Sequence, residues 1–152
     1  MVDIADTQGI PDQDKIITRS LKVYVRYSFN DNLTLGTRID YKFVDLSESC
    51  GRIMFQEINY SFRHVPVTLW VRYCMFNTQD WNSRIYTYEN DLLYSFSIPA
   101  LAGKGSRSYF MAKWKIGDLA ELRFKYAITS LVTNGLSVEN SDEIKMQFRI
   151  WF

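Results

Sequence analysis

A strict two-residue alternation of apolar and polar side chains is the feature that most constrains this fold. It is clearest in residues 145–152, the last of the sequence. Successive side chains of a β-strand point to opposite faces, so the alternation predicts a strand with one apolar and one largely cationic face. The apolar face carries Met146, Phe148, Ile150 and Phe152, and the other face carries Lys145, Gln147, Arg149 and Trp151. Soluble domains more often end in a frayed polar tail.

The same alternation recurs upstream and predicts about eight strands separated by turn-forming sequences. The expected strands are 16–29, 33–44, 52–63, 67–76, 84–98, 107–116, 119–129 and 145–152. Asn30-Asp31-Asn32 and Gly117-Asp118 are typical turn sequences between neighbouring strands. No segment shows convincing helical periodicity.

These segments predict an all-β fold, an antiparallel up-and-down meander of about eight strands that forms a transmembrane β-barrel or the C-terminal part of one. We expect one barrel domain over 15–152, and residues 1–14 are expected to form a polar loop. Residues 53–55 are apolar on both faces, so we expect a β-bulge near Gln56. The longest loop is expected over 130–143.

Alternation alone leaves open whether the barrel is soluble or spans a membrane. A lipocalin-like barrel encloses its apolar residues, and a membrane barrel presents them outward. The chain contains ten Tyr, ten Phe and four Trp, a content that favours a membrane barrel with aromatic girdles. No apolar run approaches the roughly 18 residues that a transmembrane helix needs. Two features count against the membrane prediction: loop lengths do not alternate regularly, and Leu93 and Trp151 fall on the polar face.

The polar face is rich in long charged side chains of both signs, which can fill a barrel interior with ion pairs. We expect Glu89, Asp91 and Glu121 to pair with Arg or Lys of neighbouring strands. An alternative is a basic stripe that attracts anions, formed by Lys113, Lys115, Arg123, Lys125, Lys145 and Arg149. The residues predicted to line the interior are Arg26, Arg38, Asp40, Arg72, Glu89, Asp91, Lys113, Glu121, Arg123 and Arg149.

Two stretches resemble known outer-membrane proteins. The final strand, with Phe148, Ile150 and Phe152 on one face, resembles the closing strand of bacterial outer-membrane β-barrels, where such residues form the signal read by the insertion machinery. The stretch WNSRIYTYENDLLYSFSIP (81–99), followed by GKGSRSY (103–109), resembles the C-terminal barrel region of Bacteroidota outer-membrane proteins that carry helix-hairpin-helix repeats upstream. This resemblance implies a location in the outer membrane of a Gram-negative bacterium more than an activity. Those repeats and a signal peptide are missing from this sequence, so we expect a fragment of a longer protein.

The sequence does not predict a catalytic or metal site. His64 precedes Val65 and Pro66 and is expected in a turn. Cys50 and Cys74 lack metal-ligand spacing, and a disulfide or two free thiols are equally compatible with the sequence. Glu89 and Asp91 lie two residues apart on one face, where pairing with cations is a better explanation than acid–base catalysis.

We therefore predict a non-enzymatic outer-membrane β-barrel protein, structural or pore-type, without a cofactor. Its expected partners are the lipid bilayer and the outer-membrane insertion machinery. The net charge of +1 gives no reason to expect nucleic acid as a partner. The sequence leaves open whether ions or small molecules pass through. The alternative is a soluble lipocalin-like barrel that binds an apolar small molecule.

Overall fold

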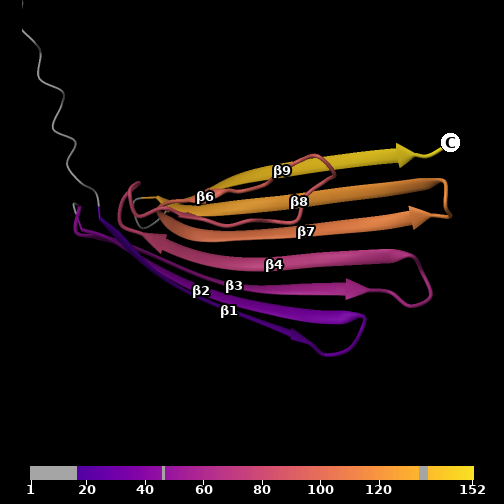
Figure 1. The fold of residues 1–152 in the computed structure, drawn as a ribbon. Helices are drawn as coiled ribbons and strands as arrows, with labels where there is room; N and C mark the ends of the chain where they lie inside the picture. The colour runs from indigo at the N-terminus through magenta and orange to yellow at the C-terminus, as the bar shows by residue number, and fades with distance from the viewer. Residues whose placement is uncertain (1–16, 46, 134–136) are drawn as a thin grey trace, which may run out of the picture.

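The computed structural model describes residues 17–45, 47–133 and 137–152, and it confirms the all-β antiparallel meander. The main sheet has seven strands in the order β1-β2-β3-β4-β7-β8-β9. Its strands are β1 (Thr18–Ser28), β2 (Leu33–Val44), β3 (Ser49–Ser61), β4 (Val67–Thr78), β7 (Lys104–Ile116), β8 (Ala120–Thr133) and β9 (Ser137–Ile150). Among these residues β1 pairs only with β2 and β9 only with β8, so the sheet is curved but open (Figure 1).

The segment 84–98, predicted as a sheet strand, is instead part of a hairpin that lies on one face of the sheet. It follows β4, which pairs directly with β7. Two short strands, β5 (Ile85–Tyr86) and β6 (Ala100–Leu101), pair with each other, and an isolated bridge joins Glu89 to Ser97. The chain reverses at Tyr94, whose φ of 63° lies in the left-handed region. We call residues 85–101 the hairpin, the sheet face beneath it the covered face, and the opposite face the open face.

The predicted bulge near Gln56 is wrong. The pairing of β3 with β2 and with β4 runs without interruption past Gln56. Ile53 and Phe55 are simply inward on the covered face, and Met54 points to the open face. Residues 53–55 are apolar on both faces because Ile53 and Phe55 pack in the cluster that also contains Ile85 and Leu101 of the hairpin.

The ends of the last strands also differ from expectation. Strand β8 continues to Thr133 and β9 begins at Ser137, so the long loop expected over 130–143 is wrong. The final strand is therefore longer than the predicted 145–152. The turn sequence Asn134-Gly135 and the N-terminal segment 1–14 lie outside the described residues.

The two faces of the sheet differ in polarity in the predicted sense. On the open face, Val23, Ile39 and Phe148 are 50%, 50% and 57% exposed. Leu69 and Leu122 on the same face are half-buried. On the covered face, buried polar side chains include Asp40, Glu57, Arg72, Arg107, Glu121 and Lys125. The apolar residues of the alternating pattern therefore do not form the core of this structure.

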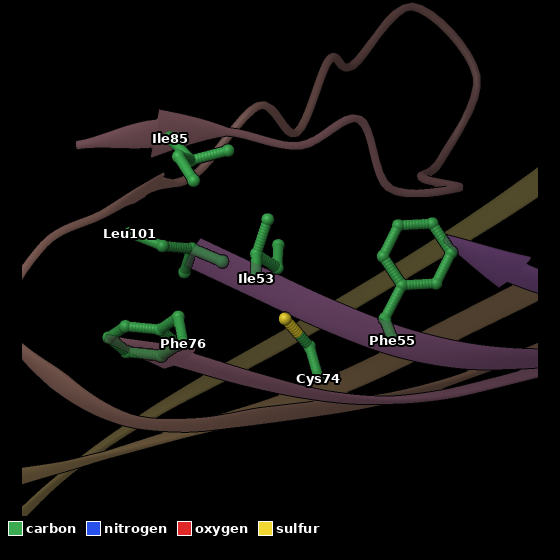
Figure 2. Packing of buried hydrophobic residues seen from close by; sticks show 6 residues of the cluster. All are labelled: Ile53, Phe55, Cys74, Phe76, Ile85 and Leu101. Atoms are coloured by element: carbon green, nitrogen blue, oxygen red, sulfur yellow. The ribbon is translucent and has the colours of Figure 1, made fainter. Parts of the chain in front are cut away.

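A small apolar cluster holds the base of the hairpin to the sheet (Figure 2). Ile85 and Leu101 of the hairpin lie above β3 and β4, and every member of the cluster is buried. The cluster consists of Ile53, Phe55, Cys74, Phe76, Ile85 and Leu101. Burying side chains of this kind contributes about 1.5–3 kcal/mol each, so the cluster fixes where the hairpin starts and ends.

Gly51 allows the chain to pass close to β3 just before the hairpin. A Cβ at Gly51 would lie 2.1 Å from the backbone oxygen of Ser83. We expect Gly51→Ala to lower the free energy of unfolding by about 1–3 kcal/mol, because backbone must move to relieve the clash. Urea titration of the refolded protein measures the change.

Gly36→Ala is the matched control, because its Cβ would meet only the hydroxyl end of the flexible Tyr24 side chain, at 3.0 Å. Equal losses for Gly36→Ala and Gly51→Ala would contradict the close approach.

Candidate functional site

The buried side chains between the hairpin and the sheet centre on Glu89. Arg107 Nε donates to Glu89 Oε1 at 2.7 Å, and Arg107 Nη2 donates to Oε2 at 2.9 Å. Lys125 Nζ donates to the same Oε2 at 3.1 Å, and Ser97 Oγ lies at 3.2 Å. Glu89 is 2% exposed and Lys125 is fully buried. The hairpin thus carries a carboxylate that binds cations from β7 and β8.

Asp91 extends these contacts to the edge strand β9. Lys145 Nζ donates to Asp91 Oδ2 at 2.9 Å, and Lys125 Nζ lies 3.7 Å from the same oxygen. Lys145 also pairs with Glu143 at 2.6 Å, and Glu143 accepts a bond from Arg107 at 3.1 Å. Two carboxylates of the hairpin therefore connect three neighbouring strands.

A second group of contacts holds the hairpin to β3 and β4. Arg72 pairs with Glu57, and the Tyr109 hydroxyl donates to Glu57 Oε2 at 2.9 Å. Arg72 Nη1 donates to Thr87 Oγ1 at 3.0 Å, within the hairpin. The Arg72 guanidinium also lies 4.1 Å from the centre of the Phe55 ring, a cation–π contact.

We call these side chains the charge network. It contains as many carboxylates as cations, and its ionic members are Glu57, Arg72, Glu89, Asp91, Arg107, Lys125, Glu143 and Lys145. In the described part of the chain, every buried side-chain nitrogen and oxygen atom has a hydrogen-bond partner. An isolated buried charge costs several kcal/mol, so this matching is what makes so many buried charges tolerable.

The electrostatics of the hairpin carboxylates favour their ionised form. Burial raises the pKa of Glu89, but Arg107 and Lys125 outweigh burial and hold it below its ordinary value. Burial also raises the pKa of Asp91, but Lys145, the Leu92 amide and Lys125 outweigh burial and hold this pKa below its ordinary value. A general acid working near neutral pH needs a raised carboxyl pKa, so this arrangement resembles a structural ion-pair network more than an acid–base pair.

The structure brings only some of the predicted interior residues together. Arg72, Glu89 and Asp91 belong to the charge network. Arg38 pairs with Asp40 along β2, and Glu121 accepts a bond from Arg123 at 2.6 Å along β8. Glu89 and Asp91 find cations on neighbouring strands, as expected, whereas the partner of Glu121 is on its own strand.

The remaining predicted residues lie outside the network. Arg26 is exposed on the edge strand β1, where its Nε donates to the Tyr24 hydroxyl at 3.2 Å. Lys113 Nζ lies 5.6 Å from the centre of the Trp70 ring, and Arg149 lies 4.7 Å from that of Trp151.

Of the six residues in the expected basic stripe, Lys125, Lys145 and Arg123 are paired with carboxylates. Lys113 and Arg123 are direct cross-strand neighbours. Lys115, Glu121 and Arg149 follow one another in register across β7, β8 and β9. Glu121 and Arg123 form the ion pair within this group. The covered face is therefore neutral under the hairpin and basic toward the β7–β8 turn.

The predicted interior residues do not include Tyr109 or five ionic members of the network, which are Glu57, Arg107, Lys125, Glu143 and Lys145, although Lys125 and Lys145 belong to the expected basic stripe. Arg107 and Tyr109 share a face with Lys113 in β7, so the alternation itself could have found them. The sequence predicts Glu143 in a loop, because the polar sequence 139–143 hides the start of β9.

Residues 17–45, 47–133 and 137–152 also include both cysteines of the chain. Cys50 and Cys74 are free thiols. Within these ranges no group of three or more His, Cys, Asp or Glu residues could hold a metal ion. No helix in the same ranges is long and apolar enough to cross a membrane. Comparison with protein-family models, characterised proteins and solved structures finds no significant match.

Removing the central carboxylate should detach the hairpin from the sheet. We expect Glu89→Gln to lower the free energy of unfolding by about 3–5 kcal/mol, because Arg107 and Lys125 would stay buried without their shared partner. Urea unfolding followed by tryptophan fluorescence measures the loss. The control is Glu139→Gln, a carboxylate on β9 that is exposed, and it should change stability by less than about 0.5 kcal/mol. Similar effects of the two variants would show that the network contributes little.

Acid should weaken the same contacts. The ordinary pKa values are 4.5 for Glu89 and 3.8 for Asp91, and both are lowered in the folded protein. Their ionised forms therefore stabilise the fold fully above about pH 4.5, and this stability is lost as the pH falls through the lowered values. The free energy of unfolding, measured between pH 7 and pH 3, should decrease once the pH is below about 4.5. This decrease should be smaller in the double variant Glu89→Gln/Asp91→Asn. If the variant and the unchanged protein lost the same stability in acid, Glu89 and Asp91 would not be the carboxylates responsible.

Proposed function

We propose that this chain forms part of the wall of a β-barrel in the outer membrane of a Gram-negative bacterium. The open face contacts lipid, and the hairpin lies in the barrel interior. The protein is non-enzymatic, with a structural or pore-type role. The observation that carries this proposal is the inverted polarity of the sheet, because its charged side chains are buried beneath the hairpin and its apolar side chains are exposed.

Strand length and the position of the aromatic residues support the proposal. The main-sheet strands contain 11 to 14 residues, and a tilted strand needs about 9–11 to cross the hydrocarbon core. Exposed aromatic side chains gather on the open face near the turns after β1, β3 and β7. They are Tyr27, Phe29, Tyr60, Phe62 and Trp114. Such a row corresponds to the aromatic girdle of a membrane barrel.

The alternative, a soluble barrel that binds an apolar molecule, needs the apolar stripe on the inside. Here Leu21, Val71 and Met146 of that stripe are exposed on the open face. A soluble protein rarely leaves a continuous apolar surface of this kind uncovered. The exposed stripe therefore favours lipid as the partner.

The resemblances found in the sequence add the proposed location and a second partner. Phe148, Ile150 and Phe152, the residues of the proposed insertion signal, are all exposed on the final strand or just beyond it. They are accessible for recognition by the outer-membrane insertion machinery. The resemblance of 81–109 to Bacteroidota outer-membrane proteins supports the same location.

Quenching of single tryptophan residues by lipid tests the proposal. Trp114 lies on the open face and Trp70 on the covered face, where it packs against a buried cluster. In vesicles of lipids brominated on their acyl chains, a variant retaining only Trp114 should be quenched at least about twofold more than one retaining only Trp70. The other tryptophan residues are replaced by Phe in both variants. Equal quenching, or none in either variant, would favour the soluble alternative.

A further inference from the structure

The two edges of the main sheet are unpaired in the described structure. Strand β1 is exposed along its whole length, and its only neighbour is β2. Strand β9 pairs only with β8. In a bilayer, backbone N–H and C=O groups that lack partners cost several kcal/mol each, so a spanning sheet must close. If the proposed function is correct, both edges must therefore meet further strands.

The strand order restricts what can close the sheet. Because all seven strands are antiparallel to their neighbours, β1 and β9 run in the same direction, as their arrowheads show (Figure 1). Direct pairing of β1 with β9 would be parallel. An antiparallel barrel therefore needs an odd number of added strands, and the strands next to β1 and β9 must both run opposite to them.

A second copy of the chain in the same orientation does not meet this requirement, because its β1 would run parallel to β9 of the first copy. An inverted copy would pair antiparallel, β1 with β1 and β9 with β9. It would, however, place the cations Lys22 and Arg26 of the two copies on adjacent strands without carboxylates, and its tight turns would lie at the opposite end of the barrel. Closure therefore requires a different β-segment.

One added strand would also be too few. An eight-stranded barrel has an interior just wide enough for side chains. Here the covered face already carries a hairpin with its own backbone. Tyr94 and Phe96 of the hairpin are 86% and 81% exposed, whereas Glu89 and Ser97 of the same hairpin are buried against the sheet. The interior must therefore be wide enough for a second layer of aromatic side chains. Since one added strand is too few, the smallest odd number of added strands is three.

The charges on β1 indicate what the neighbouring strand must present. Lys22 and Arg26 share the covered face of β1, and neither has a carboxylate partner among the described residues. They line a cavity of about 430 Å³ together with Tyr88 of the hairpin and with Glu57, whose carboxylate is already paired with Arg72. Carboxylates directly across from them on the next strand would supply the missing ion pairs.

We propose that the sheet is closed by a distinct β-segment with an odd number of strands, at least three. Its first and last strands pair antiparallel with β1 and β9. Its apolar side chains face outward, and its strand on β1 carries acidic side chains facing Lys22 and Arg26. The complete barrel has an even number of strands, ten or more. This inference depends on the proposed function for the need to close, and on the strand order and charges for the identity of the partner.

Addition of synthetic strands to the refolded full chain tests the proposal in detergent. Two peptides of strand length are compared, and in both every second residue is Val, Leu or Tyr. The residues between them are Asp and Glu in the acidic peptide and Lys in the lysine peptide. Hydrogen exchange followed by mass spectrometry reports on the β1 and β9 amides. Without a peptide, both edges should exchange fast. The acidic peptide should slow exchange in β1 at least about tenfold, and the lysine peptide should have little effect.

The variants and the stoichiometry provide the controls. The double variant Lys22→Gln/Arg26→Gln should lose the preference for the acidic peptide, and Arg52→Gln, an exposed cation on the open face, should keep it. One peptide that protected β1 and β9 together would show closure by a single strand and overturn the minimum of three. Edges already protected in the monomer or in a dimer, equal protection by the two peptides, or protection by neither would overturn the proposal. Because this test requires no lipid, its outcome is separate from that of the tryptophan quenching.

Discussion

The ion pairs between Glu89 and its two cations are the interaction on which the arrangement of the hairpin and the sheet depends. Arg107 and Lys125 come from adjacent strands, and their long side chains converge on one carboxylate of the hairpin. Breaking a buried pair by removing one member leaves an uncompensated charge, which is far more costly than the pair is stabilising. The position of the hairpin is therefore fixed by charge matching in its middle and by apolar packing only at its base. Such matching specifies one docking geometry more strictly than apolar contact does, because each carboxylate has few acceptable partners.

The network also explains why the two sides of the sheet can be so different. A sheet needs one face buried, and here a polar hairpin satisfies that need for the charged face. The open face, with Val23, Ile39 and Phe148 exposed, is then left to a different environment. An apolar solvent on that side is the simplest physical counterpart of a charged interior, and it is the basis of the proposed membrane location.

Much of this arrangement could be predicted from the sequence because side-chain alternation assigns faces directly. That rule predicts Arg72, Glu89 and Asp91 on the charged side, and the predicted bounds 33–44 of the second strand agree with β2. The hairpin could not be predicted in the same way, since a strand within a sheet and a strand lying on a sheet share one period. The reversal at Tyr94 occurs in the sequence Leu-Leu-Tyr-Ser, which contains no Gly, Pro, Asn or Asp. Glu143 was missed for a related reason, because Asn140 and Asp142 interrupt the apolar stripe at the start of β9.

The long sequence separation within the charge network has a consequence for how the chain reaches its folded state. Neighbouring strands of the main sheet are mostly consecutive in sequence, so their pairing involves short loops and can form early. Asp91 and Lys145, by contrast, are 54 residues apart, and Glu89 and Lys125 are 36 residues apart. The hairpin is thus synthesised before most of the cations that will hold it. It can dock only after β7, β8 and β9 are assembled, which makes its docking a late step and leaves its carboxylates in water until these strands have paired.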